Sequence, residues 1–173
     1  MAKMKMKELK NCEETIGLFG NGILWELDFS LKLKDSLESP KEILETFRED
    51  YLKLIQANNG EEIQTPRGKQ WGLKPPVPCS LKETATSKEV EEADAKYKAE
   101  YEAFIVNNEA IEVGYAKMLD TDITVNSQRI PVGEFKENFT YYLVPDLKGK
   151  KFSLSPSDIE SLEWLIMFSK KKK

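Results

Sequence analysis

Three cations and an indole gather within eight residues of one Gly- and Pro-rich segment: Arg67, Lys69, Trp71 and Lys74. A guanidinium can bind a phosphate through two parallel hydrogen bonds, and an indole ring can stack on a nucleobase. Arg129 is the remaining arginine outside a predicted helix, and the fold or a neighbouring subunit could bring it close. These five residues are our candidate binding site for an anionic, aromatic ligand. In the alternative, Trp71 packs on the core and the cations stay in solvent.

The residue types exclude most catalytic chemistry. The chain has 173 residues, no histidine and two cysteines. A Ser-His-Asp triad, a His-ligated metal site and a Cys₄ zinc site are therefore impossible within it. The Asp120-Thr121-Asp122 stretch lacks the glycine and the distal glutamate of a calcium loop. We expect no catalytic residue, no metal and no cofactor, and a small enzyme that uses carboxylates and a metal is the least favoured alternative.

The charge is distributed unevenly along the chain. The net charge is −4, with +3 on the first ten residues and +4 on the last four, which leaves −11 for residues 11–169. An acidic body repels a phosphate backbone, so we do not expect nucleic acid as a partner. We predict that residues 1–7 and 169–173 are disordered basic ends. The sequence shows neither an apolar region of the signal-peptide type nor an apolar run of membrane-spanning length, so we expect a cytoplasmic protein without a membrane partner.

Helical periodicity is clearest in two segments. Ser39-Pro40 begins a predicted helix over residues 40–57, and Ser87 begins a longer one over residues 88–108. We expect these helices to pack as an antiparallel pair. Residues 60–86 between them contain four prolines and three glycines and are predicted to form a long loop, with room for a hairpin across Gly68. Residues 22–36 fit both a strand and a helix, with a slight preference for a helix.

The remaining elements are predicted to be short. Residues 109–115 alternate as in a strand, and residues 123–125 and 129–132 read as strands that flank a turn. Helices are predicted over 133–143 and after Ser155. Together these elements predict a single α+β domain over residues 1–173, with an antiparallel helical pair, a small antiparallel sheet and a closing C-terminal helix.

Five segments carry a resemblance to a known group of proteins. They are residues 29–33, 47–55, 97–104, 109–113 and the C-terminal stretch from Leu154-Ser155-Pro156 to Trp164-Leu165-Ile166. Their order and spacing resemble those of small proteins of tailed bacteriophages and prophages, of unassigned function. The resemblance spans most of the chain but consists of core and capping residues. It therefore implies a fold and a viral origin, and it assigns no functional residue.

Three classes of function follow as expectations. The leading one is a non-catalytic phage accessory protein that acts by binding in the host cytoplasm as a homo-oligomer. Its sharpest version evades host defence by sequestering a nucleotide immune signal. The second is a virion assembly or scaffolding adaptor, whose partner is another phage or host protein. The third is the small carboxylate enzyme.

Overall fold

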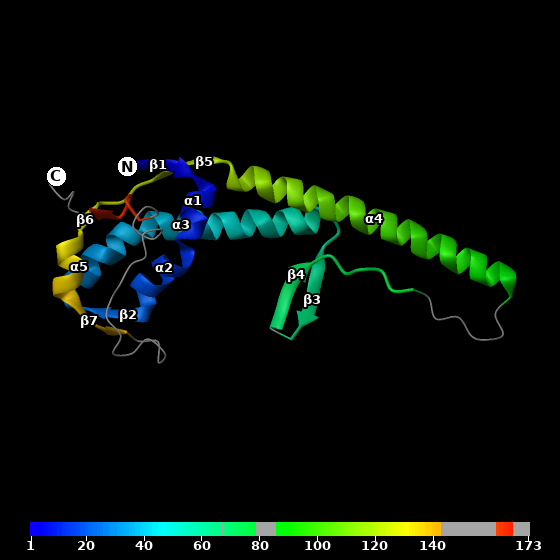
Figure 1. Ribbon diagram of the computed structural model, residues 1–173, viewed down its shortest axis with the longest axis horizontal. Coiled ribbons are helices and arrows are strands. Elements are labelled where there is room, and N and C mark those ends of the chain that lie inside the picture. The colour runs from blue at the N-terminus through cyan, green and yellow to red at the C-terminus, as the bar shows by residue number, and fades with distance from the viewer. Residues whose placement is uncertain (67, 79–85, 143–161, 168–173) are drawn as a thin grey trace, which may run out of the picture. The chain divides into compact units, whose positions relative to one another are not determined.

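The computed structural model describes residues 1–66, 68–78, 86–142 and 162–167 of the chain (Figure 1). Helices and two-stranded sheets occur together, which confirms the α+β class. The chain divides into two compact units. Unit 1 contains residues 1–47 and 118–173, and unit 2 contains residues 48–117. Among the described residues, no helix is both long enough and apolar enough to cross a membrane.

Unit 1 begins with short elements: β1 (Ala2–Lys5), α1 (Met6–Asn11), α2 (Glu13–Gly17), the π-helical turn η1 (Leu18–Gly22) and β2 (Ile23–Trp25). Strand β1 pairs antiparallel with β5 (Asp122–Val125). The prediction of a disordered end over residues 1–7 is therefore wrong. The Lys5 ammonium fixes this pairing because it lies 3.1 Å from a carboxylate oxygen of Asp122 and donates to the carbonyl of Asp120 over 2.7 Å.

Helix α3 (Leu27–Ala57) begins 13 residues before the predicted start at residue 40. Its buried stripe runs through Phe29, Leu33, Leu37, Pro40, Leu44 and Phe47. These residues follow each other at intervals of three or four, which is the spacing of one helix face. The burial of this stripe outweighs the missing amide hydrogen of Pro40, which a helix interior otherwise tolerates poorly. The slight preference for a helix in residues 22–36 is thus confirmed for residues 27–36.

The second part of unit 1 contains β5, β6 (Ile130–Pro131), α5 (Val132–Asn138), β7 (Phe139–Tyr142) and β8 (Ile166–Met167). The two strands expected to form a hairpin instead pair elsewhere, since β5 pairs with β1 and β6 pairs in parallel with β8. The helix predicted over 133–143 ends at Asn138, and β7 then pairs antiparallel with β2. Residues 162–167 form a turn and β8 rather than the end of a helix, and the rest of that predicted helix lies outside the described residues.

An aromatic cluster forms the core of unit 1. The Phe135 ring is fully buried and lies 5.4, 5.6 and 5.1 Å from the ring centroids of Phe19, Trp25 and Phe29. Leu162 is 1% exposed, so the C-terminal part of the chain also contributes to this unit's core. The core therefore joins residues from η1, β2, α3 and α5.

Unit 2 contains the last residues of α3, the hairpin of β3 (Glu61–Thr65) and β4 (Gly68–Gly72), and most of α4 (Ser87–Leu119). This hairpin agrees with the hairpin across Gly68 that was considered for the predicted loop of residues 60–86. Helix α4 includes residues 109–115, so the strand predicted there is wrong. These residues pack as part of a helix because Ile111 and Tyr115, four residues apart, lie on the side that meets α3.

Candidate functional site

The structure brings two of the predicted site residues together on the β3–β4 hairpin. Lys69 and Trp71 are alternate residues of β4, so their side chains share one face of the hairpin. Glu62 lies opposite Trp71 in the hairpin, and the Lys69 ammonium donates to the Glu62 carboxylate over 2.7 Å. Trp71 is 42% exposed and is therefore not the core residue of the alternative hypothesis. This face offers an indole, but the charge of its lysine is already paired.

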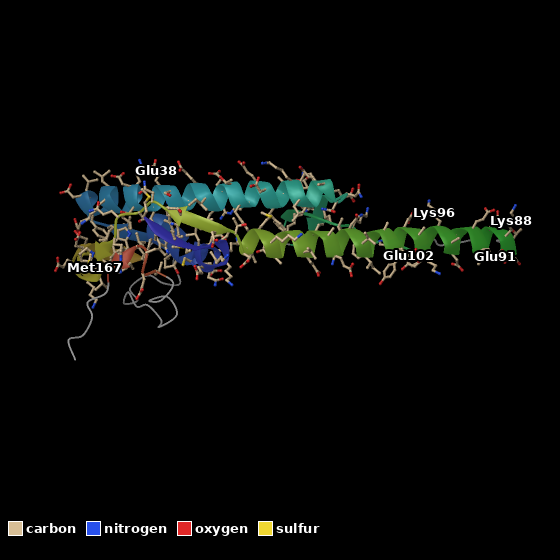
Figure 2. The ribbon with its side chains drawn as sticks, turned by 90° about the horizontal axis from the view of Figure 1, so that it is seen from above. Glu38, Lys88, Glu91, Lys96, Glu102 and Met167 are labelled. Carbon is tan, nitrogen blue, oxygen red and sulfur yellow. The ribbon has the colours of Figure 1, made fainter. Side chains whose placement is uncertain are left out.

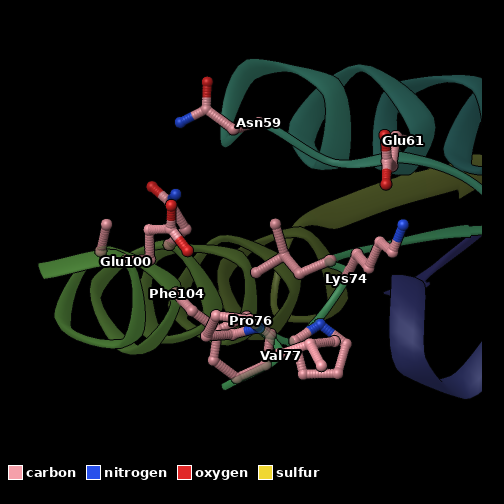
Figure 3. A pocket seen from close by; sticks show the side chains of 11 residues that line it. Asn59, Glu61, Lys74, Pro76, Val77, Glu100 and Phe104 are labelled. Atoms are coloured by element: carbon pink, nitrogen blue, oxygen red, sulfur yellow. The ribbon is translucent and has the colours of Figure 1, made fainter. Parts of the chain in front are cut away.

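Lys74 lines a groove of unit 2 with a volume of about 500 Å³ (Figure 3). Glu100 and Phe104 reach it from α4, and Lys74, Pro76 and Val77 come from the segment that follows the hairpin. Its other lining residues are Asn59, Glu61, Leu73, Pro75, Ala103 and Asn107. Trp71 does not line this groove. Two carboxylates against one ammonium make the groove a poor site for a phosphate.

Arg129 is an exposed residue of unit 1, between β5 and β6. Arg67 lies outside the described residues. Among the described residues of the predicted site that belong to unit 2, the structure sets Lys69 and Trp71 side by side.

Helix α4 meets α3 within unit 2 through its C-terminal third. A Cβ atom on Gly114 would lie 2.7 Å from a methyl carbon of Leu54, so this glycine permits a close approach of the two helices. The rings of Tyr51 and Tyr115 lie 4.9 Å apart. Position 54 meets 114 and position 51 meets 115, so the helices run antiparallel as predicted. The contact falls at residues 111–115 of α4 rather than within residues 88–108.

Next to the side that meets α3, α4 carries a row of small apolar residues, which we call the outer face: Ala99, Ala103, Val106, Ala110 and Val113. At about 100° per residue, all five lie within about 60° of Val106 around the helix axis. All five are exposed, Val106 by 63% and Val113 by 53%. Figure 2 shows α4 over this length, with the side chains of Lys96 and Glu102 pointing away from the helix. The outer face is thus an apolar helix surface open to solvent.

The first turn of α4 is capped by its own sequence. The backbone amide of Thr86 donates to the Glu89 carboxylate over 2.7 Å, and the Thr86 hydroxyl donates to the same oxygen over 2.8 Å. These hydrogen bonds, the backbone one first, lower the pKa of Glu89 from its ordinary value. Ion pairs four residues apart, Lys88–Glu92 and Lys96–Glu100, follow along the helix. These local interactions support the N-terminal half of α4, where every residue from 87 to 102 except Ala93 and Tyr97 is exposed.

Unit 1 contains a cleft of about 450 Å³ between η1, β2 and α3. Its charged lining residues are Lys34 and Lys41, both on α3. The other lining residues are uncharged: Phe19, Gly20, Asn21, Ile23, Leu24, Trp25, Ser30, Leu31, Leu33 and Leu37. No short sequence motif marks this cleft. The sequence feature that could have indicated the cleft is the spacing of four of its lining residues. Ser30, Lys34, Leu37 and Lys41 all lie on one helix face once residues 27–57 are known to form a helix.

The remaining chemical groups have structural roles. Lys5 neutralises the aspartates considered for calcium, and its pKa is raised first by the hydrogen bond to Asp122. Within the described part of the chain, no three carboxylate, thiol or imidazole groups cluster as metal ligands. The Cys12 thiol is buried and donates to the carbonyl of Glu8 over 3.2 Å, and Cys79 lies outside the described residues.

Comparisons with protein-family models, curated proteins and solved structures found no match to this chain.

Proposed function

We propose that the protein is a non-catalytic phage accessory protein that acts by association, with the outer face of α4 as the surface that binds a second copy of the chain. The observation that supports the proposal most is the apolar character of residues 101–116. Only three of these sixteen residues are charged, and apolar side chains occur on all sides of the helix. A helix of this composition is normally buried all round.

Among the residues of unit 2 that the structure describes, contacts cover the side of this helix segment that meets α3. Ile111 is 9% exposed on the α3 side, whereas Val106 is 63% exposed on the outer face. A solvent-facing helix side usually carries charged and polar residues at these positions. An association that covers the outer face would remove this apolar surface from water, which is favourable in proportion to its area.

The residues of the outer face fit an antiparallel pair of identical helices. When Ala103 faces Val106 of the second copy, Ala99 faces Ala110. Each of these two contacts therefore includes at least one alanine, whose small side chain lets the two helices approach closely. In this register Val113 lies opposite Lys96 of the second copy, and each of these contacts occurs twice by the two-fold symmetry.

The sequestration of a nucleotide signal is a narrower proposal. The hairpin gives it little support because Lys69 is paired with Glu62. The cleft of unit 1 supports it better because its two lysines have no carboxylate partner among the described residues. The alternative role of assembly adaptor uses the same outer face with a different phage protein.

Analytical gel filtration of two matched variants tests the proposal. Val106→Glu puts a carboxylate in the middle of the outer face, and we expect it to convert a dimer into a monomer. Ile105→Glu introduces the same charge at a 42%-exposed position about 100° away around the helix, and we expect it to elute as wild type does. If both variants elute as wild type, the outer face is not the association surface. Circular dichroism of each variant excludes loss of folding as the cause.

A further inference from the structure

The cleft of unit 1 combines two features of a ligand site. One is a pair of lysines, Lys34 and Lys41, as its charged lining residues. The other is an apolar wall that includes Leu24, Leu31 and Leu37. Ligand sites are typically concave, mainly apolar and equipped with a few polar groups that fix orientation. The volume of about 450 Å³ lies within the range of such sites.

The two lysines create a local positive potential in an otherwise acidic protein. They are seven residues apart on one face of α3, so their Cα atoms are separated by about 10 Å along the helix. Neither ammonium forms an ion pair or a hydrogen bond with another residue that the structure describes. In contrast, Lys32 on the same helix is paired with Glu134. Unpaired ammonium groups beside a concave surface attract an anion.

The neighbouring turn η1 leaves room for one of these ammonium groups. A Cβ atom on Gly20 would lie 2.5 Å from the Lys41 nitrogen, so the absence of a side chain lets the ammonium rest against the backbone of the turn. A π-helical turn is rare and is frequently found at functional sites. Gly20 therefore keeps the space beside the Lys41 ammonium free of a side chain.

The other polar groups of the cleft are largely engaged within the protein. The Trp25 indole donates to the carbonyl of Phe19 over 2.9 Å, and the Ser30 hydroxyl donates to the carbonyl of Trp25 over 3.2 Å. Apolar contact is left to Leu24 and Leu31, the latter 55% exposed. We propose that this cleft binds a small amphipathic anion, with a carboxylate or phosphate held by Lys34 and Lys41 and an apolar or aromatic body against the leucines. This site is independent of the outer face of α4.

Isothermal titration calorimetry with three probes tests the proposal: decanoate, AMP and inorganic phosphate. We expect decanoate or AMP to bind with one site per chain, and phosphate alone to bind at least about tenfold more weakly. Lys34→Gln and Lys41→Gln should each weaken binding about ten- to a hundredfold, the usual effect of one lost charge-assisted hydrogen bond. Lys53→Gln is the matched control because Lys53 lies on the same helix outside the cleft and pairs with Asp50.

Two further variants separate the head of the ligand from its body. Leu31→Gln should weaken decanoate or AMP without changing the binding of phosphate. Gly20→Ala should weaken all three probes in wild type but add nothing to Lys41→Gln, because both changes act on the same ammonium. A preference for decanoate would indicate a lipid-derived ligand and a preference for AMP a nucleotide, and either result supports the proposal.

Three results would overturn it. They are no binding of any probe at about 1 mM, phosphate binding as tightly as the larger probes, and unchanged binding in both lysine variants. The oligomeric state decides the proposed function separately, so either proposal can fail while the other stands.

Discussion

The aromatic core of unit 1 allows the cost of one substitution to be worked out. Phe135 is fully buried and its ring contacts three other aromatic rings at centroid distances between 5.1 and 5.6 Å. Replacement of a buried phenylalanine by alanine costs about 3–5 kcal/mol, since transfer energy is lost and a cavity remains. Aromatic pairs contribute about 0.5–1.5 kcal/mol each beyond their area. We therefore expect Phe135→Ala to lower the free energy of unfolding by about 4–5 kcal/mol.

Urea unfolding followed by circular dichroism measures this loss. At about 2–4 °C per kcal/mol for a chain of this length, the thermal midpoint should fall by roughly 8–20 °C. Phe104→Ala is the matched control, because Phe104 is only half-buried and lies in unit 2. We expect the control to cost no more than about 2 kcal/mol. A loss below about 1 kcal/mol for Phe135→Ala, or equal losses for both variants, would refute the aromatic cluster as the core of unit 1.

Three further predictions follow from individual contacts. Leu162→Ala should lower the free energy of unfolding by about 2–5 kcal/mol in urea titrations, since Leu162 is 1% exposed; a cost near zero would contradict its burial. Gly17→Ala should raise the free energy of unfolding by up to about 1 kcal/mol, because a Cβ atom at this helix position meets nothing within 4 Å. Gly114→Ala should lower it by about 1–3 kcal/mol, because its Cβ atom would meet Leu54 of α3. If Gly114→Ala is the more stable of the two variants, the close contact between the helices is disproved. Because the folded pKa of Glu89 is lowered, its capping contribution is complete above the ordinary glutamate pKa and is lost as the pH falls through the lowered value. Hydrogen exchange of the first turn of α4 should show this dependence, and Thr86→Ala, which removes the hydroxyl but keeps the backbone amide, should reduce it.

Local patterns predicted the helices better than they predicted their ends. The stripe of residues 43–55 identified the C-terminal half of α3, but the Ser39-Pro40 signal predicted a start that the buried residues Phe29, Leu33 and Leu37 override. The alternation of residues 109–115 predicted a strand because a pattern of period two and a helix apolar on several sides look alike over seven residues.

Pairing between distant strands could not be predicted from local patterns. The partner of β1 is β5, about 120 residues later, and the partner of β6 is β8. Such pairings depend on the core that both strands cover, which no short window of sequence contains. The expected hairpin of residues 123–132 was wrong for this reason.

The predicted binding residues illustrate the same limit. Proximity in sequence correctly joined Lys69 to Trp71, but the two-residue period of a strand also set Glu62 beside them and neutralised the lysine. The two lysines of the unit 1 cleft lie seven residues apart, and their shared face follows only once residues 27–57 are known to form one helix. The outer face of α4 could have been found from the seven-residue spacing of Ala99, Val106 and Val113.

The mass of the wild-type protein in solution shows whether the chain associates with itself. The chain weighs 19.9 kDa. Sedimentation equilibrium at micromolar concentration should give about twice this mass, with dissociation to the monomer on dilution and no such association in Val106→Glu. A mass of one chain at every concentration up to about 100 μM would contradict self-association through α4.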